Sequence, residues 1–156
     1  MKESILNHKK ILIVDDEPDI LTILEEEILD SCPDSKVDKA SNYESAAELL
    51  KSKEYDLVVL DIMGVRGFDL LEIAIAENLK VAMLTGHALN PKALKKSHDM
   101  GAMAYLPKEK MGEIVPFLED VLQYNHKSGW TRLIEKIGDY YTKKFESTDW
   151  KSGLWP

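Results

Sequence analysis

The chain has 156 residues, of which 44% are hydrophobic, and it carries a net charge of −8 at neutral pH. This length supports one domain with a full hydrophobic core and a short extension. The acidic balance argues against a general nucleic-acid binder, because binding to a phosphate backbone depends on clustered positive charge. The single cysteine, Cys32, excludes an intrachain disulfide, and the sequence shows no zinc-type cluster of cysteine and histidine.

The first half of the chain alternates short apolar segments with segments of helical periodicity. We predict strands at 10–15, 36–40 and 56–61, and helices at 18–31, 43–52 and 68–77. Pro18 suits the first turn of the first helix, and Ser41 or Asn42 is expected to cap the second. The strand at 36–40 is mostly polar, so we expect it at an edge of the sheet, where charged side chains discourage pairing with other chains.

The alternation continues to about residue 124. We predict strands at 80–85 and 102–106, and helices at 91–100 and 112–124. Gly101 is expected to end the helix that precedes it. Short strands separated by helices predict an α/β fold in which a parallel sheet is covered by helices on both faces.

A C-terminal extension follows, and we divide the chain into a domain at 1–125 and a helical extension at 126–156. Residues 125–129 are interpreted as a break, and a helix is predicted at 130–145. Apolar residues recur along this helix at helical spacing, namely Trp130, Leu133, Ile134, Ile137, Tyr140, Tyr141 and Phe145. This apolar stripe has to be buried on the chain's own domain, in a homodimer or against a partner protein.

Polar residues that can bind a ligand or take part in a reaction stand where four of the predicted strands end. They are Asp15, Asp16, Asp61, Thr85 and Lys108. In a parallel sheet of this kind, ligands bind outside the carboxyl ends of the strands, so these side chains are expected to converge. Three carboxylates, a hydroxyl and an ammonium group in one cleft indicate a divalent metal ion and a phosphoryl group.

Four sequence segments make this arrangement specific: "ILIVDDEPDI", "YDLVVLDIM", "VAMLTGHA" and "AYLPKE". In their order and approximate spacing, from about residue 10 to residue 124, they resemble the receiver domain of bacterial two-component response regulators. The resemblance implies a doubly wound, flavodoxin-like fold with five parallel strands in the order 2-1-3-4-5. The C-terminal helix is then an addition to that fold.

The resemblance also implies a phosphorylation site and a magnesium site. Asp61 is the expected phosphoryl acceptor, since a carboxylate attacks phosphorus to form an acyl phosphate. Mg²⁺ prefers oxygen ligands and keeps several waters. Asp16 and Asp61 are expected to bind it directly and Asp15 through water, and the family's pattern adds the backbone carbonyl of Met63.

The remaining residues of the pattern are expected to stabilise and sense the phosphoryl group. Lys108 would neutralise phosphoryl oxygens, and Thr85 would donate its hydroxyl to one of them. Thr85 and Tyr105 form the expected switch, in which the aromatic ring turns inward when the hydroxyl moves toward the phosphate. Tyr105 is equally compatible with a half-buried strand tyrosine that has no such role.

Each of these residues also has a structural interpretation when it is taken singly. Asp15 and Asp16 could cap the first helix, and Thr85 suits a strand because it is β-branched. A lysine such as Lys108 is usually a surface residue. The simultaneous presence of all of them on the right strands favours the functional interpretation.

The sequence departs from the family's pattern at two positions. Gly64 and Val65 stand where Met-Pro is usual, and the loop is about two residues shorter than expected, a path that Gly64 and Gly67 can follow. Glu109 replaces the proline that usually follows the lysine through a cis bond. Because a cis non-proline bond costs about 3–4 kcal/mol, the bond after Lys108 is expected to be trans with a rearranged loop, or strained.

We therefore expect a stand-alone phosphoacceptor that signals through its surface and is not an enzyme beyond its own phosphotransfer. Its expected partners are a histidine kinase or histidine phosphotransfer protein and a separate downstream effector. The alternatives are a degenerate receiver that only binds a partner, and a metal-dependent phosphatase, which would require Asp-x-Asp after the first strand. Residues 1–10 lack a signal peptide's apolar core and no apolar run reaches membrane length, so a cytoplasmic location is expected, with no contact to membrane or nucleic acid.

Overall fold

The computed structural model describes residues 3–152 and 154. Five parallel strands form a single sheet in the order β2-β1-β3-β4-β5, which confirms the predicted flavodoxin-like fold. The strands are β1 (Lys10–Val14), β2 (Lys36–Ala40), β3 (Leu57–Asp61), β4 (Val81–Thr85) and β5 (Ala104–Pro107). All residues of β3 and β4 are buried, as expected for central strands that helices cover on both faces.

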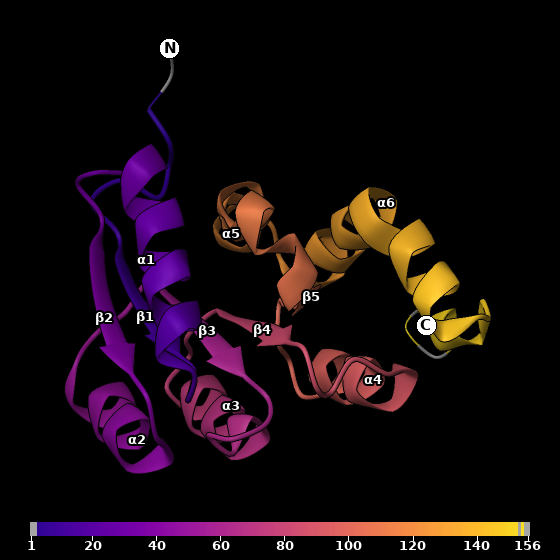
Figure 1. Cartoon of the computed structure of the whole chain (residues 1–156), viewed down its shortest axis with the longest axis horizontal. Coiled ribbons are helices and arrows are strands. Elements are labelled where there is room, and N and C mark those ends of the chain that lie inside the picture. Colours follow the sequence, from indigo (N-terminus) through magenta and orange to yellow (C-terminus); the bar gives the residue numbers. More distant parts are fainter. Residues whose placement is uncertain (1–2, 153, 155–156) are drawn as a thin grey trace.

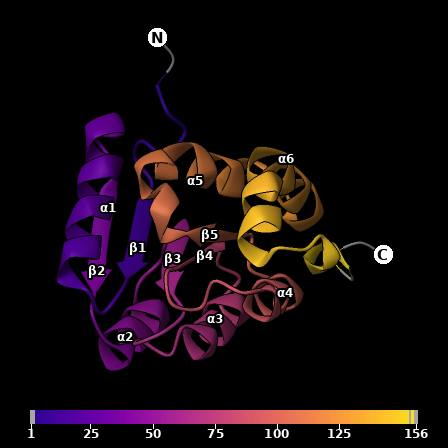
Figure 2. The same cartoon turned by 45° about the vertical axis from the view of Figure 1, so that its right-hand side comes forward.

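Helices cover both faces of the sheet (Figures 1 and 2). The helices are α1 (Pro18–Ser31), α2 (Tyr43–Ser52), α3 (Gly67–Ala76), α4 (Pro91–Asp99), α5 (Ile114–Gln123) and α6 (His126–Phe145), with the 3₁₀ helices η1 (Lys108–Glu113) and η2 (Asp149–Lys151). In both views α1 and α5 lie on one face of the sheet, and α2, α3 and α4 lie on the other. The carboxyl ends of the strands therefore meet at one open edge between the two helical layers.

The helix ends follow from local chemistry. Of the two expected caps of α2, Asn42 is the one used, because its side-chain oxygen accepts a hydrogen bond from the backbone N–H of Ser45 at 2.8 Å. Asn90 caps α4 in the same way, and Pro91 occupies the first turn. Gly101 adopts a φ of +101° just after α4, a conformation that glycine reaches without a Cβ penalty.

The predicted break at 125–129 is wrong, because α6 begins at His126. Asn125 is the N-terminal cap and accepts a hydrogen bond from the backbone N–H of Ser128 at 2.8 Å. Gly129, the last residue of that segment, lies inside the helix and is buried. The predicted helix at 112–124 is likewise divided into η1 and α5.

The apolar stripe of α6 is buried on the chain's own fold. Trp130 and Tyr141 are fully buried, and Leu133 and Ile137 are nearly so. Figure 2 shows α6 beside β5, the edge strand, in contact with the rest of the domain. Of the three ways to bury the stripe, the structure shows packing within the chain. Among the described residues, no helix is long and apolar enough to cross a membrane.

Candidate functional site

Three carboxylates come together at the ends of β1 and β3. Oxygen atoms of Asp15, Asp16 and Asp61 all lie within 4.8 Å of one another. Asp15 and Asp61 expose only 1% and 3% of their surface, whereas Asp16 is exposed. β1 and β3 are paired neighbours in the sheet, which is why residues just after one strand reach residues at the end of the other. The cluster is therefore open to solvent on the side of Asp16.

Lys108, the first residue after β5, places its ammonium group in this cluster. Its Nζ lies 2.8 Å from Asp15 Oδ2 and 3.6 Å from Asp61 Oδ2. A third partner, Glu17, accepts a hydrogen bond from the same Nζ at 2.9 Å. Glu17 was not among the predicted site residues, although it is the third acidic residue of the run that begins at Asp15. Lys108 is thus held closer to Asp15 and Glu17 than to Asp61.

Burial and mutual repulsion make the cluster electrostatically unusual. Burial, followed by the neighbouring charges of Asp15 and Asp16, raises the pKa of Asp61 to about 6. Burial also raises the pKa of Asp15, although the Lys108 ammonium opposes this shift. Burial by itself lowers the pKa of Lys108, but hydrogen bonds to Asp15 and Glu17 outweigh it, so the lysine pKa is raised overall. Negative charge in this cluster is costly, and a cation would relieve the cost.

The loop after β3 approaches the cluster closely, which explains its glycines. Gly64 has a φ of +85°, and a Cβ atom there would clash with the Asp16 carboxylate. A Cβ at Gly67 would clash with the backbone carbonyl of Asp61. The shorter loop is therefore accommodated by these two glycines. Met63, between Asp61 and Gly64, exposes 53% of its surface.

The donor set fits a hard divalent cation. Asp15, Asp16 and Asp61 offer only oxygen ligands, and the described residues place neither cysteine nor histidine in this group. Mg²⁺ is bound in proteins by one or two carboxylates together with waters, and a cluster that is exposed at Asp16 leaves room for those waters. The raised pKa of Asp61 is a second indication, because an ion at this position offsets the repulsion among the carboxylates.

Thr85 and Tyr105 are joined through the backbone of one residue, Ala88, in the loop after β4. Thr85 is fully buried, and its hydroxyl oxygen accepts a hydrogen bond from the backbone N–H of Ala88 at 2.9 Å. The hydroxyl of Tyr105 donates to the carbonyl of Ala88 at 2.5 Å and accepts from the N–H of Asn90 at 3.0 Å. Tyr105 is fully buried rather than half-buried, because α6 packs beside it.

Glu109, the other departure from the family's pattern, points away from the cluster and toward α6. No peptide bond among the described residues is cis, so the bond between Lys108 and Glu109 is trans, and the chain continues directly into η1. The Glu109 carboxylate lies 3.0 Å from the Nζ of Lys144. The loop is thus rearranged, and the residue that replaces proline forms an ion pair with the C-terminal helix.

The structure thus brings Asp15, Asp16, Asp61 and Lys108 into direct proximity. Thr85 ends β4, the strand next to β3, and in this structure its hydroxyl faces its own loop. Tyr105 is one contact further from the carboxylates, behind Ala88.

A family model described as "Response regulator receiver domain" matches residues 11–118. A search among curated proteins gave no match. Among solved structures, a CheY-like receiver domain protein from Methanospirillum hungatei is 25% identical, with a TM-score of 0.58, and the match covers 87% of this chain and 98% of that one.

Two further structures support the fold. The beryllofluoride-activated DrrB receiver domain is 21% identical with a TM-score of 0.63, and the match covers 74% of this chain and 98% of that one. The phosphorylated cyanobacterial phytochrome response regulator RcpA is 20% identical with a TM-score of 0.65, with 74% and 94% covered. Because the family model spans most of the chain and the fold and strand order agree with it, the chain belongs to the response regulator receiver domain family.

Proposed function

We propose that the chain is a phosphoacceptor of a two-component system and that Asp61 receives the phosphoryl group. The observation that carries this proposal is the buried carboxylate of Asp61 beside two further carboxylates and the ammonium of Lys108. A structural ion pair needs one acid for one base, whereas this cluster gathers an excess of negative charge at the open end of the sheet.

Magnesium would be held by Asp15, Asp16 and Asp61, and we infer that the backbone carbonyl of Met63 completes the protein's share of the ligands. When bound, the ion would offset the carboxylate charge and the charge of the incoming phosphoryl group. Gly64 serves this site by leaving room for the Asp16 carboxylate.

In the transfer step, a carboxylate oxygen of Asp61 forms a bond to phosphorus. The bond between phosphorus and the donor breaks, and its electron pair leaves with the donor, which for a phosphohistidine is the imidazole nitrogen. Lys108 then has a stronger electrostatic partner than Asp15 or Glu17, because a phosphoryl group carries more negative charge than a carboxylate. Thr85 can follow by turning its hydroxyl from Ala88 to a phosphoryl oxygen.

The expected donor is a histidine kinase or a histidine phosphotransfer protein, and the output goes to a separate effector. Self-association is not required to bury the stripe of α6, because Trp130 and Tyr141 are already buried within one chain.

The direct test is incubation with Mg²⁺ and acetyl phosphate, followed by intact mass measurement. We expect the mass of one added phosphoryl group, which disappears in the Asp61→Asn variant and when Mg²⁺ is chelated. Asp139→Asn, which changes an exposed aspartate of α6, is the matched control and should label normally. No added mass, together with no binding of beryllofluoride, would favour the degenerate receiver, and sustained release of phosphate from a small ester would favour a phosphatase.

A further inference from the structure

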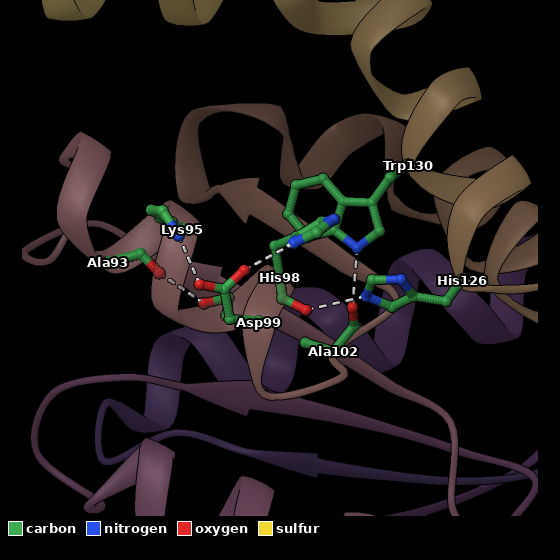
Figure 3. A network of polar contacts seen from close by, with 8 residues as sticks. Ala93, Lys95, His98, Asp99, Ala102, His126 and Trp130 are labelled. Atoms are coloured by element: carbon green, nitrogen blue, oxygen red, sulfur yellow. Dashed lines mark hydrogen bonds and ion pairs between the residues drawn. The ribbon is translucent and has the colours of Figure 1, made fainter. Parts of the chain in front are cut away.

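Two side-chain hydrogen bonds tie the C-terminal helix α6 to the backbone of β5 and of the segment just before it. The indole N–H of Trp130 donates to the carbonyl of Ala102 at 2.8 Å (Figure 3). The hydroxyl of Tyr141 donates to the carbonyl of Tyr105. Trp130 and Tyr141 are about three helical turns apart and therefore share one face of α6. The two bonds therefore fix α6 just before the edge strand and at the second residue of that strand.

One line of contacts leads from this interface to the phosphoacceptor site. The ring centroids of Tyr141 and Tyr105 are 5.8 Å apart. The hydroxyl of Tyr105 donates a hydrogen bond to the carbonyl of Ala88, and the N–H of Ala88 donates one to the hydroxyl oxygen of Thr85. All three of the side chains in this line, those of Thr85, Tyr105 and Tyr141, are fully buried. A movement at Thr85 therefore reaches α6 through packed groups.

A second line of contacts reaches α6 from Lys108. Glu109 follows Lys108 directly and pairs with Lys144 of α6 at 3.0 Å. This ion pair lies at the surface, since the two side chains are 62% and 45% exposed. The neighbouring ring of Tyr140 also belongs to α6, and the Nζ of Lys144 lies 5.8 Å from its centroid. The backbone that carries Lys108 is thus anchored to α6 by the next residue.

We propose that docking of α6 opposes phosphorylation of Asp61, with Glu109 and Lys144 as positioning residues that hold Lys108 in its present arrangement. This inference rests on the proposed phosphoacceptor function. In the present arrangement Lys108 is 2.8 Å from Asp15 but 3.6 Å from Asp61, and the hydroxyl of Thr85 is engaged by Ala88.

The direction of the effect follows from where these groups have to move. A phosphoryl group on Asp61 draws Lys108 toward itself and pulls Glu109 from Lys144. The same group draws the hydroxyl of Thr85 away from Ala88, which loosens the loop that holds Tyr105. Both movements weaken contacts made by α6. Because coupling between two binding events is reciprocal, a weaker α6 contact has to favour the phosphoryl state by the same factor that the phosphoryl state loosens α6.

The test measures affinity for beryllofluoride, a phosphoryl mimic, in the presence of Mg²⁺ and on the full chain. Lys144→Gln and Glu109→Gln should each bind it about 1.5-fold to 5-fold more tightly than the unmodified chain, the range for an exposed ion pair. Lys143→Gln is the matched control, since Lys143 is exposed on the same last turn of α6, and it should bind with unchanged affinity. The double reversal Glu109→Lys with Lys144→Glu should restore the original affinity.

The reciprocal measurement is hydrogen exchange of the α6 amides with and without beryllofluoride. Exchange in α6 should become faster when beryllofluoride is bound, while exchange in α2, on the other side of the sheet, stays the same. Binding of beryllofluoride with unchanged exchange in α6 and unchanged affinity in both glutamine variants would overturn the inference and leave the proposed function standing. Failure of the unmodified chain to bind beryllofluoride would overturn both.

Discussion

The two halves of the site differ in how they are built. At the ends of β1 and β3, the side chains of Asp15, Asp16 and Asp61 meet one another directly. At the ends of β4 and β5, Thr85 and Tyr105 contact the loop between them, and β5 in turn contacts α6. The first half, which we call the charged half, gathers three carboxylates. The second, which we call the distributed half, is a series of contacts spread over β4, β5 and α6. If Asp61 is the phosphoacceptor, as we propose, the acceptor carboxylate and the contacts that reach α6 lie on different strands of one sheet edge.

The largest expected effect is at the centre of the charged half. Asp61→Asn should abolish phosphorylation, because the amide has no nucleophilic charge. Without metal at neutral pH, the same change should raise the free energy of unfolding by about 1–3 kcal/mol, since it removes a buried charge whose pKa is raised to about 6. Urea unfolding in the presence of a chelator measures this.

Adding Mg²⁺ tests the charged half in a second way. It should stabilise the unmodified chain against urea and stabilise the Asp61→Asn variant much less. A variant that is less stable than the unmodified chain without metal would show that Asp61 supports the fold rather than strains it. Asp139→Asn again serves as the control, because that carboxylate is exposed.

The charged half could be predicted from the sequence because each residue stands at the end of its own apolar run. The parallel sheet brings strand ends together, so the proximity of Asp15 and Asp61 could be predicted without knowledge of side-chain contacts. The same reasoning applied to Lys108, which follows β5 and extends its side chain to these carboxylates. Glu17 was missed because it begins a helix rather than ends a strand. Its role depends on the path of the Lys108 side chain, which no local pattern encodes.

The distributed half could not be predicted in the same way. The apolar stripe of α6 was evident, but what it packs against depends on tertiary structure, and the buried Tyr141 reaches the carbonyl of Tyr105 across a long stretch of sequence. Glu109 was recognised only as a departure from a pattern. Its partner Lys144 lies on a helix whose placement the sequence does not define.

Trp130→Ala tests whether α6 is packed on β5 in solution. It should lower the free energy of unfolding by about 3–5 kcal/mol, because it removes a fully buried indole and its hydrogen bond to Ala102. Ile23→Ala, at an isoleucine that is 39% exposed on α1, should change it by less than about 1 kcal/mol. Similar losses from the two substitutions would mean that the stripe is not buried within the chain.

Gly64→Ala tests the close approach of the loop to the charged half. The new methyl group would clash with the Asp16 carboxylate at a backbone position with φ of +85°, which costs about 1–3 kcal/mol. Mg²⁺ affinity, measured by titration, should fall by about tenfold. Gly112→Ala is the control, since no heavy atom lies within 4 Å of a Cβ built there. An unchanged affinity in Gly64→Ala would separate Asp16 from the metal site.

Glu17→Gln tests how firmly Lys108 is held in its present position. The neutral amide removes one of the two close carboxylates around the Lys108 ammonium. Beryllofluoride should then bind up to about 5-fold more tightly, the upper range for an exposed ion pair. Weaker binding would show that Glu17 helps to orient Lys108 toward the phosphoryl group.

The smallest expected effect is a pH dependence at the base of α6. His126 packs against the ring of His98 with centroids 4.7 Å apart, and its Nε2 lies 2.9 Å from the carbonyl of His98 (Figure 3). Burial lowers the pKa of His126 below its ordinary value. The contact with the His98 carbonyl and, to a smaller extent, the charge of Asp99 oppose this only partly. The neutral imidazole is therefore the form that the folded state prefers.

The direction in which stability changes with pH follows from the difference between the folded and unfolded pKa of His126. Because the folded pKa of His126 is lower than the unfolded one, its contribution to stability is present above about pH 6.5 and is lost as the pH falls below that value. Asp61 acts in the opposite sense, since its raised pKa means that metal-free protein gains stability as the pH falls through about 6. The two effects overlap, so the histidine has to be measured in the Asp61→Asn background. There, unfolding at pH 7.5 and pH 5.5 should differ less in the added His126→Gln variant than in its parent. An equal difference in both would place the pH dependence elsewhere than at the contact between α4 and α6.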